Sequence, residues 1–303
     1  MWFKNLLVYR LTKPFSHTQE QLENALQAFS FKPCGSQDLS QLGWVSPLGK
    51  QGQTLSHSAN NELLICVKKE EKILPATVVR DALQEKVEHQ ESEQQRALKK
   101  AEKQALKDDI VQQLLPRAFT RHAFTFAWVS PDGNFIAVDA ASSRKAEELL
   151  GLLRKSLGSL PVVPLNLSTP ADVTMTDWLN QGDLPKGFEL GDEAELRSAL
   201  EHGGIIRCKE QDLLSDEIAA HLAADKMVTK LALNYADNLS FVLGDDLALK
   251  RLKFADELLE ENDDITSDDP LARFDADFTL LCAELRQFIP ALIEALGGEQ
   301  VTE

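Results

Sequence analysis

The chain has 303 residues, of which 43% are hydrophobic and 26% are charged, a balance typical of a globular protein with a buried core. No apolar run approaches the roughly 18 residues that a membrane helix needs. The N-terminus has too short an apolar stretch for a secretory signal and lacks a small-residue cleavage site. The scattered cysteines show no metal-ligand or redox spacing, so we expect buried thiols in a reducing, cytoplasmic compartment. They are Cys34, Cys66, Cys208 and Cys282.

The charge is unevenly distributed along the chain. The formal net charge is −16, but residues 1–170 hold 21 lysines and arginines against 18 acidic residues. Residues 171–303 hold 11 basic and 30 acidic residues. DNA-binding domains are usually basic, yet such asymmetry lets one face attract a polyanion while another repels it. The net charge therefore weakens a nucleic-acid function without excluding it.

The first elements are a strand at residues 3–11 and a helix at 19–29, followed by a loop rich in Gly, Ser and Pro at 33–52 and a buried strand at 63–67. Pro75 stands where a helix can start, and nothing breaks a helix from there to Lys107. Its apolar spacing vanishes across residues 88–96, which is typical of a helix that projects into solvent. A second short helix, capped by Asp108 or Asp109, ends at Pro116.

The later elements begin with a hairpin of strands at 124–129 and 135–138, a helix from 142 or 143 to 157, and a strand at 160–167. Beyond them we predict strands near 173–178, 205–208, 228–234, 240–243 and 249–254, and helices at 193–201, 215–224 and 270–296. Paired strands without strict alternation predict an α+β fold with mixed or antiparallel sheets. The predicted division is a central α/β body (1–74 and 120–168), a helical projection (75–119) and a second, acidic α+β region (169–303).

The sequence offers no convincing enzymatic motif. The segment GWVSPLGKQ at 43–51 has five residues between its glycines, and Gln51 stands where a phosphate loop needs a hydroxyl. His57 between two serines is a weak signal for nucleophilic catalysis. Four aspartates lack the alternation of a calcium loop and are better explained as a solvated linker: Asp263, Asp264, Asp268 and Asp269. We expect no catalytic residue, no metal and no cofactor.

Basic residues give a better signal. Five of them fall at steps of 3, 1, 3 and 4, along one stripe of the predicted helix: Arg96, Lys99, Lys100, Lys103 and Lys107. Such a stripe suits contacts to phosphates, which supply affinity without sequence information. The alternative is a solvated helix whose acidic start and basic end complement its dipole, and both interpretations stay open. Further candidates for DNA contacts are Arg117, Arg121, Lys250 and Arg251. Because no base-reading motif accompanies them, DNA binding should be poorly sequence-specific.

Two phenylalanines flank the end of the predicted projection. Phe124 begins a strand, so we expect it in the core. Phe119 follows Pro116 and Arg117, where an exposed ring would mark an interface; core and interface remain equally open for it.

Several segments, in order and over the whole chain, carry a resemblance to a known family. They are WFKNL (2–6), PCGSQD (33–38), KEEKILP (69–75), LLPRAF (114–119), LRKSLGSLPVVP (153–164), LKRLKF (249–254) and RFDADF (273–278). These segments resemble the bacterial recombination-associated RdgC family.

The resemblance implies a protein that binds double-stranded, and also single-stranded, DNA without sequence preference. It implies a ring-shaped head-to-head homodimer around the duplex, antagonism of RecA in recombination and replication-fork repair, and a cytoplasmic, nucleoid-associated location. A basic inner wall and an acidic outside would reconcile the charge with DNA binding. The projection would close one dimer contact, with Phe119 as its gate. The family often has two lysines before Gln-Asp where this chain has Lys209 and Glu210, so Lys209 is the weaker candidate for a DNA contact.

A competing hypothesis is a pure interaction protein whose acidic half docks on RecA or another repair factor without binding DNA itself. Mobility that is independent of random duplex DNA at low salt would favour it.

Overall fold

The structure is a computed structural model, which describes residues 2–200, 203–262 and 269–300. Three aspartates of the predicted solvated linker, at 263, 264 and 268, lie outside the described residues. The first half forms β1 (Asn5–Leu11), α1 (Gln19–Gln27), β2 (Ser40–Val45), β3 (Ser56–Ala59), β4 (Glu62–Ile73), α2 (Ala76–Gln94) and α3 (Lys100–Leu114). Next come β5 (Phe119–Ser130), β6 (Phe135–Val138), α4 (Ser143–Leu157) and β7 (Val162–Pro164), with short 3-10 turns at Gly49–Gln51 and Leu115–Arg117.

The second half begins with α5 (Ala171–Gln181), β8 (Phe188–Ser198), β9 (Ile205–Cys208) and α6 (Asp216–Ala223). It ends with β10 (Lys226–Tyr235), β11 (Leu239–Gly244), β12 (Leu249–Phe254), α7 (Asp256–Glu260) and α8 (Pro270–Ala295).

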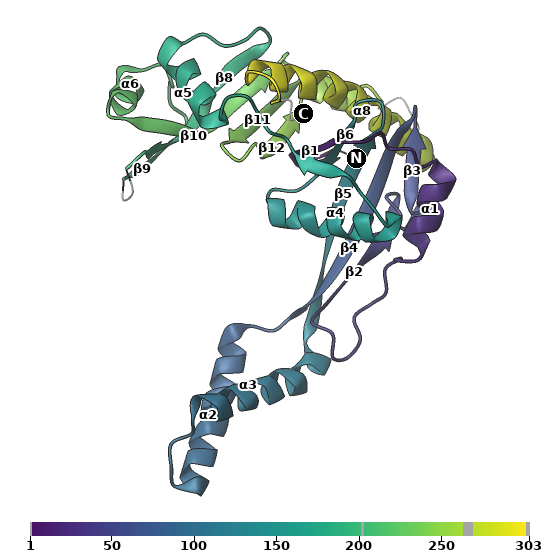
Figure 1. Cartoon of the computed structure of the whole chain (residues 1–303), viewed down its shortest axis with the longest axis vertical. Helices are drawn as coiled ribbons and strands as arrows, with labels where there is room; N and C mark the ends of the chain where they lie inside the picture. The colour runs from purple at the N-terminus through teal and green to yellow at the C-terminus, as the bar shows by residue number, and fades with distance from the viewer. Residues whose placement is uncertain (1, 201–202, 263–268, 301–303) are drawn as a thin grey trace.

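One antiparallel sheet of twelve strands runs through both halves, in the order β2-β4-β5-β6-β1-β12-β11-β10-β8-β9, with β3 beside β4 and β7 beside β1. The halves join where β1 pairs with β12, Asn5 lying opposite Lys250 and Leu6 opposite Leu249. Figure 1 shows the strands β8 to β12 with α5 and α6 at the upper left, and the helices α2 and α3 far below the main body. The predicted α+β class is confirmed, whereas the division into three domains stays a prediction.

Two hydrophobic cores lie on opposite faces of the sheet. Successive side chains of a strand point to opposite faces, so Leu6 and Leu64 enter one core while Leu7 and Ile65 enter the other. The first core also takes the apolar residues of α5, α6 and α8, and the second those of α1 and α4. The sheet is therefore covered by helices on both faces in its first half, whereas in its second half α5, α6 and α8 all pack on the same face.

Several predicted elements have the right position and type. The hairpin of β5 and β6, the helices α4, α6 and α8, and the strands β10 to β12 all lie where the sequence predicts them. In each case the signal is local: an alternating or 3.6-residue pattern between clear turn residues.

Outside residues 75–119, three predictions of secondary structure are wrong. Residues 173–178 belong to the helix α5, because Met175 and Leu179 lie one turn apart and both enter the core. Residues 193–198 belong to the strand β8, where Ala194 and Leu196 point inward and the charged residues that alternate with them point away. The predicted loop at 33–52 contains β2. A glycine is required inside this strand because a Cβ at Gly43 would lie 2.4 Å from the Cα of Phe31.

Candidate nucleic-acid interface

The projection is an antiparallel helical hairpin on a β ribbon. β4 and β5 pair without interruption from Leu63 opposite Val129 to Ile73 opposite Phe119, and α2 and α3 continue from the far ends of these strands (Figure 1). The chain reverses between the helices, where Gln95 has a φ of 52°. The prediction of one unbroken helix from Pro75 to Lys107 is therefore wrong.

Tertiary contacts explain the reversal. Apolar spacing is lost in the second half of α2, but folding back buries Leu98 and Ile110 within the hairpin. The Glu91 carboxylate of α2 accepts a hydrogen bond of 2.8 Å from the Leu98 backbone N–H. These contacts lie between segments that no sequence periodicity connects. The second predicted helix start, at Asp108 or Asp109, is also wrong, since both residues lie inside α3.

The predicted basic stripe is divided by this reversal. Arg96 lies in the connecting loop, 2.6 Å from Glu102, and Lys99 directly precedes α3. Lys103 lies 3.0 Å from Glu91 of α2. The five cations therefore do not share one helix face, and only Lys100 and Lys107 remain as exposed cations of α3 from this set.

At the base of the projection, two exposed apolar side chains lie opposite each other. Phe119 is 84% exposed and pairs with Ile73, which is 45% exposed. Phe124 is 52% exposed, so its predicted place in the core is wrong. The pairing of β5 with β6 ends at Ala127, and the segment with Phe124 continues beyond it as a ribbon with β4.

The remaining basic candidates of the first half lie at the same end of the molecule. Arg117 is exposed just before β5. Arg121 lies 2.8 Å from Glu71 across the β4–β5 ribbon. Glu71 also lies 3.0 Å from Lys69, which contacts Glu148 of α4, so Arg121 faces the side of the sheet that carries α4.

The face of β8 to β12 turned away from α8 is polar and has no covering helix among the described residues. On β10, Leu231 and Leu233 enter the core with α8, while Lys230 and Ala232 alternate with them on the opposite face. Six cations of this polar face come from four strands or their ends: Arg197, Arg207, Lys209, Lys230, Arg251 and Lys253.

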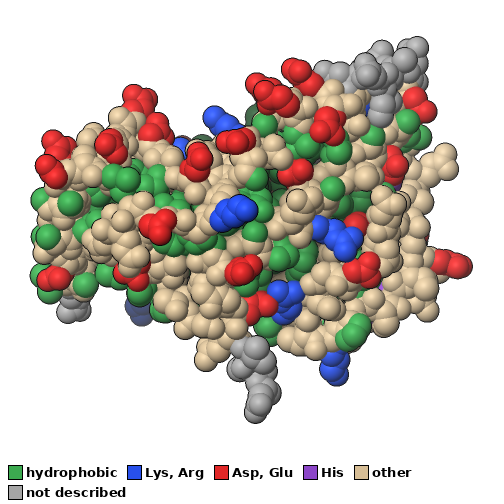
Figure 2. All heavy atoms as spheres, turned by 90° about the horizontal axis from the view of Figure 1, so that it is seen from above, with side chains coloured by type: hydrophobic (Ala, Val, Ile, Leu, Met, Phe, Trp, Pro, Cys, Tyr) green, Lys and Arg blue, Asp and Glu red, His purple; other side chains and the backbone are tan. Residues whose placement is uncertain are grey.

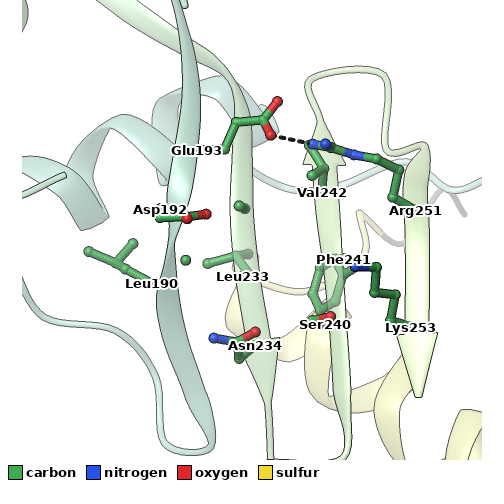
Figure 3. Close-up of a pocket in the computed structure, with 12 residues that line it drawn as sticks. Leu190, Asp192, Glu193, Leu233, Asn234, Ser240, Phe241, Val242, Arg251 and Lys253 are labelled. Atoms are coloured by element: carbon green, nitrogen blue, oxygen red, sulfur yellow. Dashed lines mark ion pairs between the residues drawn. The ribbon is translucent and has the colours of Figure 1, made fainter. Parts of the chain in front are cut away.

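Three of the predicted residues lie on or beside this polar face. Arg251 lies 2.8 Å from Glu193 of β8 (Figure 3), and Lys209 lies 4.0 Å from the same carboxylate. Lys250 lies 4.0 Å from Asp246. The structure thus brings Lys209 and Arg251 together, although the sequence separates them widely.

Sequence reasoning missed three cations on the polar face. Arg197, Arg207 and Lys230 surround the carboxylate of Glu195, at 3.7, 2.7 and 2.9 Å. The interpretation of residues 193–201 as a helix concealed this arrangement. The alternation of charged Glu193, Glu195 and Arg197 with apolar neighbours is the strand signal that reveals it.

A shallow hollow of about 550 Å³ lies in the middle of the polar face. Its floor consists of small side chains, among them Ala232, Ser240 and Val242, and Arg251 and Lys253 reach over it from β12 (Figure 3). A Cβ at Gly191 would lie 2.8 Å from the Cβ of Ala232, so only glycine fits at that position. The hollow therefore offers cations and polar groups to a ligand that lies along the sheet.

Acidic side chains predominate on the face of the molecule that is seen from above. Figure 2, a view from above, shows them around much of the outline of the molecule, with few basic ones between them. Acidic groups of this kind disfavour the approach of a polyanion to that face.

The structure also describes the other candidate groups. Within the described residues, no cluster of three or more His, Cys, Asp or Glu side chains has a geometry for a metal ion, and no helix is long and apolar enough to span a bilayer. His57 lies 3.0 Å from Asp275 and packs against Phe274 and Phe278 of α8. Cys66 and Cys282 are buried as expected, whereas Cys34 and Cys208 are partly exposed.

Comparisons with known proteins cover the whole chain. A family model described as "Putative exonuclease, RdgC" matches residues 1–299. Proteins named "Recombination-associated protein RdgC" from Aeromonas hydrophila, Tolumonas auensis and Serratia proteamaculans are 65%, 60% and 54% identical, over 99% of this chain and 99% of each relative. The match confirms the resemblance seen in the sequence: the chain belongs to the RdgC family.

Proposed function

We propose that the chain binds DNA without sequence preference, encircles the duplex as a ring-shaped homodimer, and modulates RecA-dependent recombination and replication-fork repair. The names of its relatives support a role in recombination. The observation that carries DNA binding is the polar face, which concentrates six cations in the half of the chain where acidic residues dominate.

The chemistry of the polar face fits a phosphate backbone. Lysine and arginine contacts to phosphates fix a protein on DNA but read no bases. The cations come from neighbouring strands, which lie about 4.8 Å apart, so they form a broad surface. Six cations stand there against their carboxylate partners Glu193 and Glu195 and the carboxylate of Asp192, which also lines the hollow.

The two ends of the molecule support a ring. At one end Phe119 and Ile73 expose apolar side chains beside the projection. At the other end Leu200, just after β8, and Ile205 of β9, the last strand of the sheet, do so. A two-fold dimer joins each surface to its own copy. If both ends pair in this way, two chains enclose a hole, and the polar face, turned away from α8, lies on the side towards which the projection extends (Figure 1). Phe119 then belongs to the gate.

A ring of this kind explains antagonism of RecA through occupancy. DNA inside the hole is not available to another protein that must coat it. Association with the nucleoid follows from the same lack of sequence preference, and binding of single strands from the shared phosphate backbone. In this proposal the exposed cations Lys100, Lys107 and Arg117 extend the basic surface onto the projection.

The decisive experiment compares random-sequence linear duplexes with closed circles of the same sequence across a salt series. Electrostatic binding predicts that log affinity falls by roughly 0.9 per log unit of salt for each phosphate neutralised. Encirclement predicts that retention at high salt is much longer on circles than on linear DNA. A flat salt response or a strong preference for one sequence contradicts DNA binding of this type, and a protein that leaves DNA mobility unchanged at low salt is the interaction protein.

The same samples address the exonuclease named in the family description. With Mg²⁺ or Mn²⁺ present, we expect linear DNA to keep its length while it is bound. Progressive shortening from the ends would replace the proposal of a non-enzymatic ring.

A further inference from the structure

Glu195 lies at the centre of a row of charged residues that crosses three strands. In the sheet register Glu195 of β8 lies opposite Arg207 of β9 on one side and opposite Lys230 of β10 on the other. Arg207 Nε donates to its carboxylate at 2.7 Å and Lys230 Nζ at 2.9 Å. Arg197, two residues further along β8 and on the same face, approaches to 3.7 Å.

Burial separates the carboxylate from its cations. The Glu195 side chain is only 5% exposed, whereas those of Arg197, Arg207 and Lys230 are 53%, 67% and 40% exposed. The acid is thus enclosed under three cations whose outer surfaces face solvent. One negative charge against three positive charges leaves an excess of about two positive charges, at the point of the polar face nearest to the edge strand β9.

The hydrogen-bonding capacity of the cluster is also directed outward. A guanidinium has five N–H donors and an ammonium has three. The bond to Glu195 uses Nε of Arg207, and Thr229 Oγ1 supplies a further donor to the carboxylate at 3.2 Å. The terminal NH₂ groups of Arg207 therefore remain for a second acceptor, in the fork geometry that suits phosphate oxygens.

The buried carboxylate explains why three like charges can gather here. Without it they would repel one another and their long side chains would spread into solvent. The bonds from Lys230 and Arg207 hold the pKa of Glu195 down to about 2, so it stays ionised at neutral pH. Groups that are held in place before a ligand arrives lose less entropy when they bind it.

Glu193 shows what a less enclosed carboxylate does on the same face. It is 26% exposed and contacts two cations, Arg251 at 2.8 Å and Lys209 at 4.0 Å. A phosphate that approaches Arg251 therefore competes with a solvent-exposed acid. At Glu195 the acid is covered, and a phosphate meets the cations first.

We propose that Arg197, Arg207 and Lys230 form one binding site for a phosphate group of the nucleic-acid backbone, and that Glu195 is the positioning residue that assembles it. The inference rests on the proposed function, because the phosphate comes from bound DNA. It adds which side chains make one of the contacts and how an acidic residue strengthens the contact.

The first test observes the site directly. In the full-length protein with ¹⁵N-labelled arginine, the Nε–H resonance of Arg207 should shift when random-sequence duplex DNA is added. Millimolar inorganic phosphate should shift it in the same direction, because the site recognises the phosphate group itself. DNA that binds without moving this resonance overturns the inference but leaves the proposed function intact. A resonance that moves with DNA and not with inorganic phosphate also overturns it. If duplex DNA does not bind the wild-type protein at all, the proposed function fails.

The second test uses matched charge changes. The double variant R207Q/K230Q should lower the slope of log affinity against log salt by roughly 0.9, the loss of one phosphate contact. R207Q combined with K186Q, at an exposed lysine in the loop before β8, removes the same total charge but should retain more affinity than R207Q/K230Q. Equal losses in the two double variants would show that only net charge matters and would overturn the site.

The third test isolates positioning by Glu195. Glu195→Gln makes the protein more positive, so charge alone predicts tighter DNA binding, whereas loss of the organising carboxylate predicts weaker binding. We expect weaker binding, with partial recovery in Glu195→Asp, which keeps the charge. Affinity is compared per folded molecule, from thermal unfolding of each variant. Tighter binding by folded Glu195→Gln would make Glu195 a competitor of the phosphate and overturn its positioning role.

Discussion

Phe119 lies directly opposite Ile73 at the last register position of β4 and β5, and both side chains are exposed to solvent. Cross-strand neighbours on one face of a ribbon present a joint surface. Here that surface is apolar and lies where the projection begins. Exposed aromatic side chains contribute little to the stability of a monomer and much to an interface. The sequence leaves both core and interface open for Phe119, and its exposure beside Ile73 favours the interface.

We predict that Phe119→Ala leaves thermal stability almost unchanged, because the side chain is 84% exposed. In the proposed ring it removes an aromatic anchor from one of two dimer contacts, a loss of about 2–4 kcal/mol for an interface hot spot. The other contact preserves the dimer, so the mass in solution stays the same. Dissociation from closed circular DNA at high salt should become faster, while association at low salt is similar to that of the wild type.

Phe124 supplies the matched control on the same strand. It is 52% exposed, and its side chain points to the opposite face of β5, since the two positions differ by an odd number. Phe124→Ala should leave retention on circles unchanged. A Phe119→Ala protein that unfolds earlier but stays on circles normally, per folded molecule, would contradict the assignment to the gate.

Lys103 and Lys107, one helical turn apart on α3, allow a second prediction. Lys103 is paired with Glu91, whereas Lys107 is exposed. Lys107→Gln should therefore weaken binding to duplex DNA at low salt more than Lys103→Gln, although both remove one charge. Lys103→Gln should mainly destabilise the hairpin, by the roughly 0.2–1 kcal/mol that a surface ion pair contributes. Amide hydrogen exchange in the hairpin should then become faster. A greater loss of DNA affinity in Lys103→Gln would show that the pair with Glu91 opens when DNA binds.

The fold could be predicted from the sequence where the signal was local. The hairpin of β5 and β6 combines alternating apolar residues with a turn, and α8 has a continuous helical pattern. By contrast, residues 173–178 contain β-branched residues typical of strands, and only packing of Trp178 and its neighbours against β10 makes them helical. Tertiary contacts here override local propensity.

The candidate site was less predictable, because its residues meet across strands. Glu193 contacts Lys209 at the end of β9 and Arg251 of β12. No spacing in the sequence predicts this contact. The basic stripe was predicted from a regular spacing in the sequence, but its residues do not share one helix. Arg96 and Lys99 lie outside α3, because the chain reverses at Gln95.

Glu195 leads to a prediction for pH. Its pKa lies at about 2 in the folded protein against a usual 4.5, so the folded state favours the ionised form. The resulting stabilisation is fully present above about pH 4.5 and is lost as the pH falls from there towards 2. The stability difference between wild type and Glu195→Gln should therefore be constant from pH 7 to 5 and shrink below pH 4. Urea unfolding at pH 7, 5 and 3 measures it, and a difference that grows on acidification would contradict the ion-paired state.

The pKa of Glu62 is shifted in the opposite direction to that of Glu195. Its carboxylate is buried and accepts hydrogen bonds from Trp128 Nε1 at 2.8 Å and Ser130 Oγ at 3.2 Å, with Arg286 at 3.1 Å. Burial nevertheless raises the pKa of Glu62 above its usual value. Between the usual pKa of the unfolded chain and the raised pKa of the folded protein, the folded state binds more protons than the unfolded state. Stability therefore falls as the pH rises through this window. Above this window the cost of the buried charge persists.

Glu62→Gln should consequently be as stable as the wild type or more stable at pH 7, because the amide oxygen can still accept from Trp128 and the partly exposed Arg286 turns to solvent. Glu62→Leu leaves the buried donors of Trp128 and Ser130 without this acceptor, at about 1–3 kcal/mol for each unsatisfied group, and should be clearly less stable. Urea unfolding at pH 7 and 4 checks both variants. Below the window the advantage of Glu62→Gln should disappear, since the wild-type carboxyl is then protonated. If Glu62→Gln loses as much stability as Glu62→Leu at pH 7, the ion pair with Arg286 outweighs the cost of burial.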